Sequence, residues 1–166
     1  MMSKLGVLSD THGRFAETQS AVRIFREQEV TKIIHCGDIG GAAIIQAFRG
    51  IETHFVFGNC DYELDSLRVT AAENGHIFHD WFGSLEWEGK KICFLHGHCQ
   101  NQFETELHSG HWDLICYGHT HVPTLELHGN TLLLNPGAFR RVAVPQIAIV
   151  TLPELTVESR SIVPIF

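Results

Sequence analysis

Short apolar runs alternate with helical patterns through the first half of this 166-residue chain. Three of these runs have the length of strands, namely residues 5–8, 32–35 and 53–57. Between them, residues 15–28 and 42–48 carry apolar side chains near helical spacing. Because such alternation favours a largely parallel sheet with helices packed against it, we expect an α/β fold.

The second half of the chain is richer in predicted strands. Three strand pairs have hairpin spacing: 84–87 with 91–95, 124–127 with 131–134, and 146–152 with 155–162. Residues 102–108 predict a short helix and residues 113–117 a buried strand. The pattern indicates two sheets face to face with helices outside them. Since no repeat or Pro/Gly/Ser-rich linker interrupts it, we predict a single domain over residues 1–166.

The composition is typical of a globular protein outside the membrane. Hydrophobic residues make up 44% of the chain and charged residues 19%, and no window of about 18 apolar residues could cross a bilayer. Residues 1–10 lack the cationic start and apolar stretch of a signal peptide. The five cysteines show no CxxC spacing, which favours buried reduced thiols. We therefore expect a cytoplasmic protein.

The charge balance and the histidine content point away from nucleic acid and towards metal. A formal net charge of -7 argues against a stable nucleic-acid complex, because affinity for a polyanion comes mainly from lysine and arginine. Twelve histidines are many for this length, and several fall in the glycine-flanked clusters His96-Gly97-His98 and Gly118-His119-Thr120-His121. Imidazole is a common metal ligand, so these clusters are candidate metal sites.

Each of five predicted strands stops at residues suited to metal binding. In chain order these residues are Asp10 with His12, Asp38, Asn59, His96, and His119 with His121. Ligand sites collect at the carboxyl ends of parallel strands, since the loops there converge over one edge of the sheet. We therefore expect the seven side chains to meet in one place.

The mixture of carboxylates, imidazoles and an amide suits two divalent ions. Such ions lie about 3.5 to 4 Å apart and need a carboxylate that bridges them, for which Asp38 is the candidate. Any one of these residues alone is more often a hydrogen-bonded loop or capping residue. The ordered set of strand-end signals favours the metal site. The other histidines are predicted to be structural or on the surface: His35, His54, His76, His79, His108, His111 and His128.

The same residues carry a family resemblance. The blocks are Ser9-Asp10-Thr11-His12-Gly13, Gly37-Asp38, Gly58-Asn59-Cys60-Asp61, His96-Gly97-His98, Gly118-His119-Thr120-His121 and Asn135-Pro136-Gly137. Together and in this order they resemble the calcineurin-like metallophosphoesterase signature. The chain is most similar to the small single-domain phosphodiesterase group called YfcE-type. The resemblance implies a four-layer αββα sandwich of two mixed sheets flanked by helices.

The resemblance also implies a division of the ligands. Asp10, His12 and His121 would bind the first metal ion and Asn59, His96 and His119 the second, with Asp38 shared. Manganese is our prediction for the metal; iron, zinc and nickel are the alternatives that the same nitrogen and oxygen ligands accept.

The predicted catalytic residues are Asn59 and His98. Many members of the family carry a histidine after the asparagine, where it is thought to protonate the leaving group, but here that position is Cys60. His98 is the next candidate to contact the phosphate or to supply a proton. Cys60 could equally be a packed residue without a chemical role.

The hypothesis is that a hydroxide bridging the metals attacks phosphorus in line with the leaving group. Two carboxylates and the hydroxide would leave about one net positive charge on two divalent ions, which matches the monoanion of a small phosphodiester or nucleotide-like substrate. Without a strong general acid at Cys60, we expect aryl esters to be favoured. A phosphomonoesterase, a nucleotide pyrophosphatase, and a protein-binding scaffold like the retromer subunit are the alternatives. A homodimer remains open, since no interface motif is present.

Overall fold

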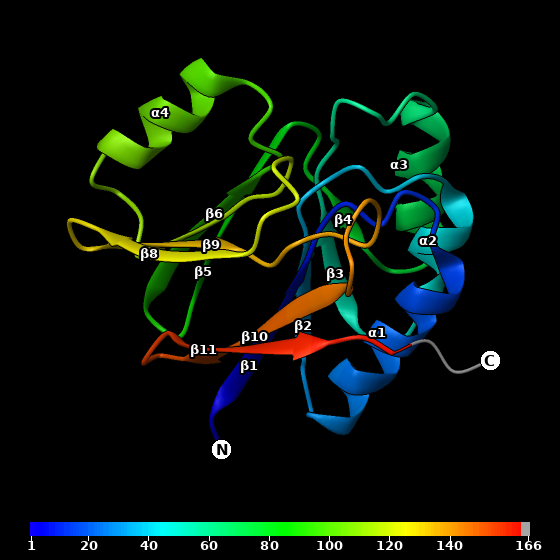
Figure 1. Ribbon diagram of the computed structural model, residues 1–166, viewed down its shortest axis with the longest axis horizontal. Helices are drawn as coiled ribbons and strands as arrows, with labels where there is room; N and C mark the ends of the chain where they lie inside the picture. The colour runs from blue at the N-terminus through cyan, green and yellow to red at the C-terminus, as the bar shows by residue number, and fades with distance from the viewer. Residues whose placement is uncertain (164–166) are drawn as a thin grey trace.

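Two β-sheets pack face to face in the computed structural model, which describes residues 1–163 (Figure 1). The predicted domain of residues 1–166 therefore ends three residues beyond the described part. The first sheet contains six strands: β1 (Ser3–Leu8), β2 (Lys32–His35), β3 (Glu52–Phe55), β4 (Ile77–Phe78), β10 (Gln146–Leu152) and β11 (Thr156–Ser161). Its order is β11-β10-β1-β2-β3-β4, with β1 to β4 parallel and β10 antiparallel to both neighbours.

The second sheet contains five strands in the order β5-β6-β7-β9-β8. They are β5 (Phe82–Trp87), β6 (Lys90–Leu95), β7 (Leu114–Cys116), β8 (Thr124–His128) and β9 (Thr131–Asn135). The three central strands are parallel, and an antiparallel hairpin adds each edge strand. The β5–β6 hairpin has a two-residue turn, Glu88-Gly89. Both residues have positive φ, and a two-residue turn of this conformation matches the right-handed twist of the two strands. Both sheets are thus mixed.

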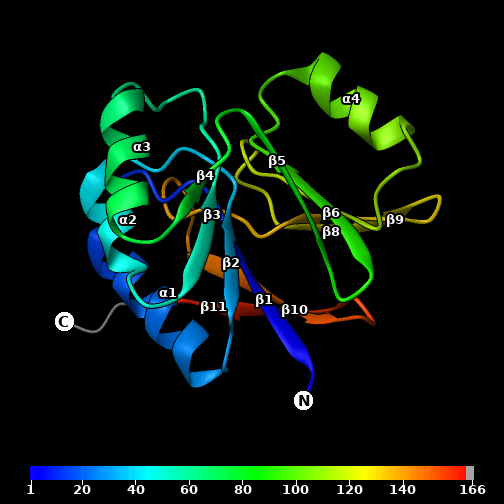
Figure 2. The same ribbon diagram turned by 180° about the vertical axis from the view of Figure 1, so that it is seen from behind.

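Four helices cover the outer faces of this pair of sheets (Figures 1 and 2). They are α1 (Phe15–Glu27), α2 (Ala42–Ala47), α3 (Leu64–Glu73) and α4 (Gln100–His108). The first three lie beside the first sheet, and α4 lies on the far side of the second sheet. The order of layers is therefore helices, sheet, sheet, helix.

Three apolar clusters fill the spaces between these layers, and the two-residue period of the strands divides the side chains among them. In β1, Leu5 and Val7 face the second sheet, whereas Leu8 packs towards the helices. In β6, Ile92 and Phe94 enter the space between the sheets, whereas Cys93 and Leu95 pack on the α4 side. Both faces of each central strand are buried, which explains their near-continuous apolar sequence.

The predicted α/β sandwich of two mixed sheets with outer helices is confirmed. Helix α3 and strand β4 were not predicted, because α3 buries only Leu67, Thr70 and Ala71 and β4 has two residues. The prediction of buried thiols is wrong for two cysteines. All five are free, but Cys60 and Cys99 are exposed, since both lie in loops after strands. None of the helices in the described part has the length and apolar character needed to span a bilayer.

Candidate metal centre

The seven residues predicted as metal ligands all lie in loops after the carboxyl ends of strands. Asp10 and His12 follow β1, Asp38 follows β2, Asn59 follows β3, His96 follows β6, and His119 and His121 follow β7. The first three strands are neighbours in one sheet, and the last two are neighbours in the other. The sheets face each other, so the loops from both meet at a shared edge.

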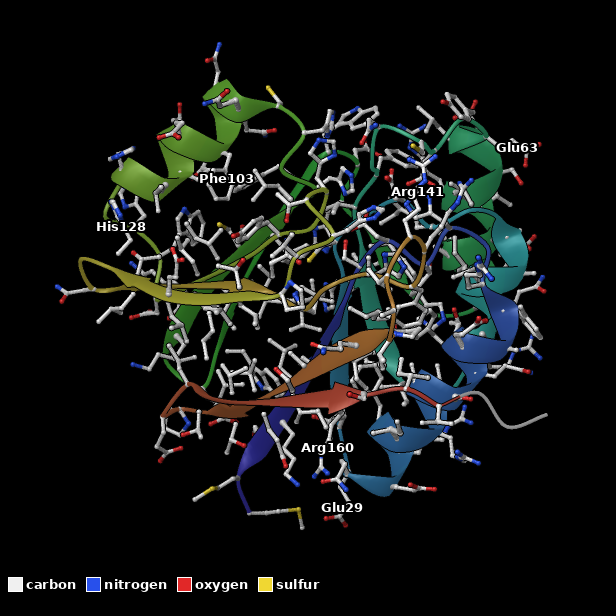
Figure 3. All side chains as sticks on the ribbon, viewed as in Figure 1. Glu29, Glu63, Phe103, His128, Arg141 and Arg160 are labelled. Carbon is white, nitrogen blue, oxygen red and sulfur yellow. The ribbon has the colours of Figure 1, made fainter. Side chains whose placement is uncertain are left out.

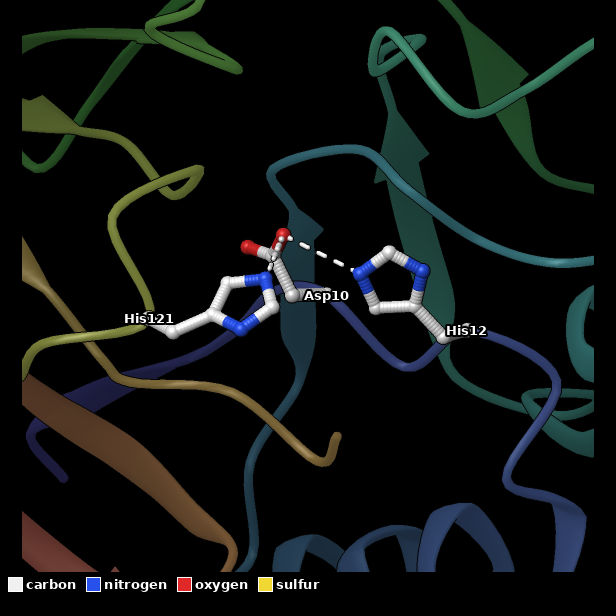
Figure 4. A group of neighbouring side chains, drawn as sticks. All are labelled: Asp10, His12 and His121. Atoms are coloured by element: carbon white, nitrogen blue, oxygen red, sulfur yellow. Dashed lines mark hydrogen bonds and ion pairs between the residues drawn. The ribbon is translucent and has the colours of Figure 1, made fainter. Parts of the chain in front are cut away.

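Asp10 lies at the centre of the first group (Figure 4). Its Oδ1 atom is 3.1 Å from His121 Nε2 and 3.5 Å from His12 Nε2. The two imidazole rings reach this carboxylate from opposite sides. The other oxygen, Oδ2, accepts hydrogen bonds from Ser9 Oγ at 2.6 Å and from the backbone N–H of His119 at 3.0 Å. One oxygen thus holds the loops together while the other faces the two rings.

Asp38 joins this group to the next. Its Oδ2 atom is 3.2 Å from His96 Nε2 and 3.5 Å from His12 Nε2, and its Oδ1 accepts the backbone N–H of Cys60 at 2.8 Å. His96 Nδ1 donates a hydrogen bond to the Cys36 carbonyl at 2.8 Å. A carbonyl can only accept, so Nδ1 carries a proton, and the neutral ring would present the lone pair of Nε2 to the centre.

Asn59 and His119 form the open side of the centre. His119 Nδ1 is 3.2 Å from Asn59 Oδ1, and the ring centroids of His119 and His96 are 5.2 Å apart. Both side chains are exposed to solvent, whereas Asp10 and His96 are buried. All seven predicted positions therefore belong to one connected group, with a buried floor and an accessible side.

The donor atoms of this group suit a divalent cation. The Nε2 atoms of His12 and His96 are buried near carboxylates but make no hydrogen bond to a described residue. Burial alone would raise the pKa of Asp10 and Asp38, but contacts with the imidazoles and N–H groups leave the pKa of both carboxyls below the ordinary value. The ligand atoms of Asp10, His12 and His121 lie within 4.8 Å of one another, as do those of Asp10, Asp38 and His96. Ionised carboxylates and neutral imidazoles are ligands for manganese, iron, zinc or nickel.

Backbone strain is concentrated in the centre. Five of the seven residues have φ between 45° and 68°, in the left-handed region: Asp10, His12, Asp38, His119 and His121. A non-glycine residue in this region costs roughly 1–2 kcal/mol. A strained backbone conformation persists only where contacts with neighbouring residues hold it in place, and such residues are common at functional sites.

Two glycines let the carboxylates pack against neighbouring backbone. A Cβ atom at Gly58 would overlap with Asp38 Oδ1, and one at Gly118 would overlap with Ser9 Oγ and Asp10 Oδ2. Neither glycine can therefore be replaced without moving a candidate ligand.

Two residues that fix the loops had no predicted role. Buried Asp61 accepts backbone N–H groups of Ile39 and Gly58, each at 2.9 Å, and so ties the loop after β2 to the loop after β3. Asn135, at the end of β9, donates to the Gly118 carbonyl and to Thr120 Oγ1, each at 3.0 Å. Asp61 belongs to the motif Gly58-Asn59-Cys60-Asp61 and Asn135 to the motif Asn135-Pro136-Gly137. Membership in these motifs was the only sequence signal for the two residues.

The two candidates for proton transfer lie at the rim. His98 is exposed, with its ring centroid 5.5 Å from that of His96 and 6.3 Å from that of His119. Partial burial, followed by the proximity of His96 and His119, lowers the pKa of His98. Cys60 Sγ lies within 4.8 Å of ligand atoms of His12 and Asp38, close to the candidate ligands, as its position after Asn59 suggested. Burial and then Asp38 raise the pKa of this thiol.

A cavity of about 460 Å³ opens on the accessible side of the centre. Its walls are His12, Asp38, Asn59, Cys60, His119, Thr120, His121, Arg140 and Arg141. A second cavity of about 390 Å³ shares His119 and Thr120 and is lined by His98, Phe103 and Tyr117 under α4. Volumes of this size are typical of small-molecule sites. Arg140 and Arg141 had no place in the predicted site.

Comparison with known proteins agrees with this geometry. The family model of the calcineurin-like phosphoesterase superfamily domain matches residues 3–155. Phosphodiesterase MJ0936 of Methanocaldococcus jannaschii is 34% identical over 137 residues, which are 81% of this chain and 82% of that protein. Phosphodiesterase YfcE of Escherichia coli strain K12 is 28% identical over 160 residues, or 87% and 82% of the two chains.

A solved structure of an archaeal phosphodiesterase superposes with a TM-score of 0.89 at 29% identity, covering 96% of this chain and 99% of that chain. The match therefore includes both sheets and the strand ends that carry the candidate ligands. The chain belongs to the calcineurin-like phosphoesterase superfamily, in the group of small metallophosphoesterases that includes MJ0936 and YfcE.

Proposed function

We propose that this protein is a phosphodiesterase that uses two divalent metal ions bound by the seven residues of the centre. The observation that supports it best is the pair of ionised carboxylates, Asp10 and Asp38, surrounded by imidazole nitrogens without hydrogen-bond partners. The activity of MJ0936 and YfcE, both named phosphodiesterases, supports the reaction class.

Asp10, His12 and His121 would hold one ion, and Asn59, His96 and His119 the other, with Asp38 between them. The position of Asp38, within 3.5 Å of a ring from each group, supports its bridging role. Bound divalent ions would supply the Lewis acidity that activates a water molecule and polarises the phosphoryl oxygens. The strained, glycine-lined loops would keep the ligands in place through the reaction. Manganese is our proposed ion, and iron, zinc or nickel are the alternatives that the same nitrogen and oxygen ligands accept.

His98 is proposed to contact the phosphate or to exchange a proton with the leaving group. Its exposed ring beside His96 and His119 supports contact with a substrate in either cavity. A lowered pKa leaves little of its cationic form at neutral pH, and Cys60 has a raised pKa, so neither is a strong acid. Substrates with good leaving groups, such as aryl diesters, should therefore react fastest.

A phosphomonoesterase is the second candidate function. Two carboxylates and an activated hydroxide would leave about one net positive charge on the two ions, which suits a diester monoanion. The presence of Arg140 and Arg141 in the cavity favours the alternative, because added cations would stabilise a monoester dianion. The protein-binding scaffold is less favoured, since every ligand position of the family motif is filled. We place the enzyme in the reducing cytoplasm, in keeping with five free thiols.

The test is hydrolysis of bis(p-nitrophenyl) phosphate and p-nitrophenyl phosphate by metal-stripped protein, with and without added manganese. We expect manganese to restore diesterase activity, and Asp38→Ala and His121→Ala each to abolish it. Circular dichroism and thermal melting of both variants would exclude misfolding as the cause. Activity on the monoester alone would overturn the diester assignment. Stoichiometric metal binding without any hydrolysis would favour the scaffold.

A further inference from the structure

We propose that Arg140 and Arg141 form an anion subsite that binds a phosphate group other than the one cleaved. The natural substrate would then be a phosphodiester that carries an additional terminal phosphate. This inference rests on the proposed phosphodiesterase function and narrows its substrate class.

Both arginines line the same cavity as the candidate ligands. Its walls also include the candidate ligands His12, Asp38 and His119. The volume of about 460 Å³ is large for one phosphate and lies within the range of about 300–1,000 Å³ that holds small-molecule ligands. A ligand whose scissile phosphate lies at the centre can therefore extend to the arginines.

The two guanidinium groups have no protein partner among residues 1–163. Each of the other six arginines makes an ion pair or a hydrogen bond: Arg14, Arg23, Arg26, Arg49, Arg68 and Arg160. No such contact involves Arg140 or Arg141, although acidic residues outnumber basic ones by 19 to 12. Two adjacent cations without acidic partners, in a chain of net charge -7, are therefore available to an anionic ligand.

The loop that carries the arginines is anchored to the centre. The backbone N–H of Phe139 donates to the Asp10 carbonyl at 3.1 Å, and the Phe139 ring is buried in the cluster beneath the helices. Both arginines are exposed directly after this anchor, and Arg141 has a left-handed φ of 58°. Figure 3 shows Arg141 beside the loops of the centre. The backbone that carries the two arginines is thus held next to the metal ligands by the Phe139 anchor.

Arginine suits this role because its planar group donates two parallel hydrogen bonds to a phosphate and remains charged at all relevant pH values. A single scissile diester has one negative charge, which balances the charge of about +1 left by the ions, the two carboxylates and the hydroxide. A terminal phosphate adds nearly two negative charges and matches the two arginines. Arg140 and Arg141 would therefore select substrates that carry a terminal phosphate, and the metal centre would hydrolyse the diester.

The test compares the dinucleotides ApA and pApA, which share one scissile diester and differ by a 5′-phosphate. We expect the manganese enzyme to prefer pApA by about 10- to 100-fold in kcat/KM. Arg140→Gln/Arg141→Gln should abolish this preference and lower hydrolysis of bis(p-nitrophenyl) phosphate, which has no terminal phosphate, much less than hydrolysis of pApA. Arg23→Gln, at an exposed arginine on α1, is the matched control.

Calorimetry with metal-stripped protein supplies a readout independent of turnover. Wild-type protein should bind pApA more tightly than ApA, and the double variant should bind both alike. Equal binding and equal kcat/KM for the two dinucleotides in wild-type protein would overturn the proposal. So would a double variant that lost hydrolysis of p-nitrophenyl phosphate instead, since the arginines would then serve a monoester. If bis(p-nitrophenyl) phosphate were not hydrolysed, the proposed function would fail while the binding comparison still decided the subsite.

Discussion

Two cavities in the described part of the chain are each lined by three histidines, and only one of them has the geometry of a metal centre. The first region is the cavity at the candidate ligands of the strand ends. The second is a cavity of about 320 Å³ between α4 and the β8–β9 turn, lined by His108, His111, His128 and Asp113. Figure 3 shows His128 on the opposite side of the view from Arg141, which lies beside the first region.

The two regions differ in burial and in what holds their side chains. His96 is 1% exposed and oriented by the Cys36 carbonyl, whereas His108, His111 and His128 are all exposed. His108 Nδ1 lies 2.8 Å from a carbonyl of its own helix, that of Glu104. Among the described residues, none of the groups with ligand atoms within 4.8 Å of one another comes from this second region. Residue type alone therefore does not make a metal site; converging loops and buried carboxylates do.

The largest difference in activity should come from replacing a histidine by alanine in each of the two regions. His96→Ala removes a buried candidate ligand, so on the proposed dinuclear centre we expect the enzyme to lose one of two manganese ions. The kcat/KM for bis(p-nitrophenyl) phosphate should fall on the order of 10³-fold. His108→Ala should retain both ions and activity within twofold. Elemental analysis and steady-state kinetics would measure both. Equal losses in the two variants would contradict the distinction between the regions.

A second contrast uses glycines. Gly118→Ala places a methyl group against Ser9 and Asp10, and we expect a loss of about 1–3 kcal/mol in unfolding free energy and about 10²-fold in activity. Gly129→Ala, in the β8–β9 turn, meets open space but has a φ of 59°, so it should lose about 1–2 kcal/mol without loss of activity. Denaturant titration and kinetics separate the outcomes. A Gly118 variant of full activity would show that Asp10 tolerates displacement.

A third contrast concerns exposed histidines. His98→Ala should reduce turnover of alkyl diesters by about 10- to 100-fold and of aryl diesters by much less, because only poor leaving groups need a proton. His111→Ala is the matched control and should leave both rates unchanged. A plot of log kcat against the pKa of the leaving group measures the difference. Equal losses for both ester types would assign His98 to phosphate binding.

The smallest effect concerns stability at low pH. Burial lowers the pKa of His35 to about 3 from an ordinary value of 6.5. The unfolded chain therefore binds a proton that the folded chain excludes, and stability falls as the pH drops from about 6.5 towards 3. Between pH 7 and 5 this loss is about 2 kcal/mol.

Urea titration of metal-stripped protein at both pH values measures this loss. His35→Asn should reduce the difference between pH 7 and pH 5 by about 2 kcal/mol, whereas His108→Asn, at an exposed position, should not change it. An unchanged pH dependence in the His35 variant would show that another group controls acid stability.

Much of the fold could be predicted, because the spacing of apolar residues along the chain indicates where strands and helices occur. The alternation of apolar runs and helical segments predicted two sheets with outer helices, and the limits of β2 and β10 were predicted without error. The order of the strands within each sheet was not predictable, since β1 pairs with β10 more than 130 residues away. Helix α3 was missed because few of its residues are buried.

The sequence by itself determined which strand ends carry carboxylates and imidazoles, because a ligand's type and its distance from a strand are local properties. Only the tertiary structure decided the distances between these ligands, that Asp61 and Asn135 tie the loops, and that Arg140 and Arg141 line the cavity. These contacts join residues from separate strands and two sheets. Their positions depend on how the sheets pack, and that packing is not encoded in any single segment.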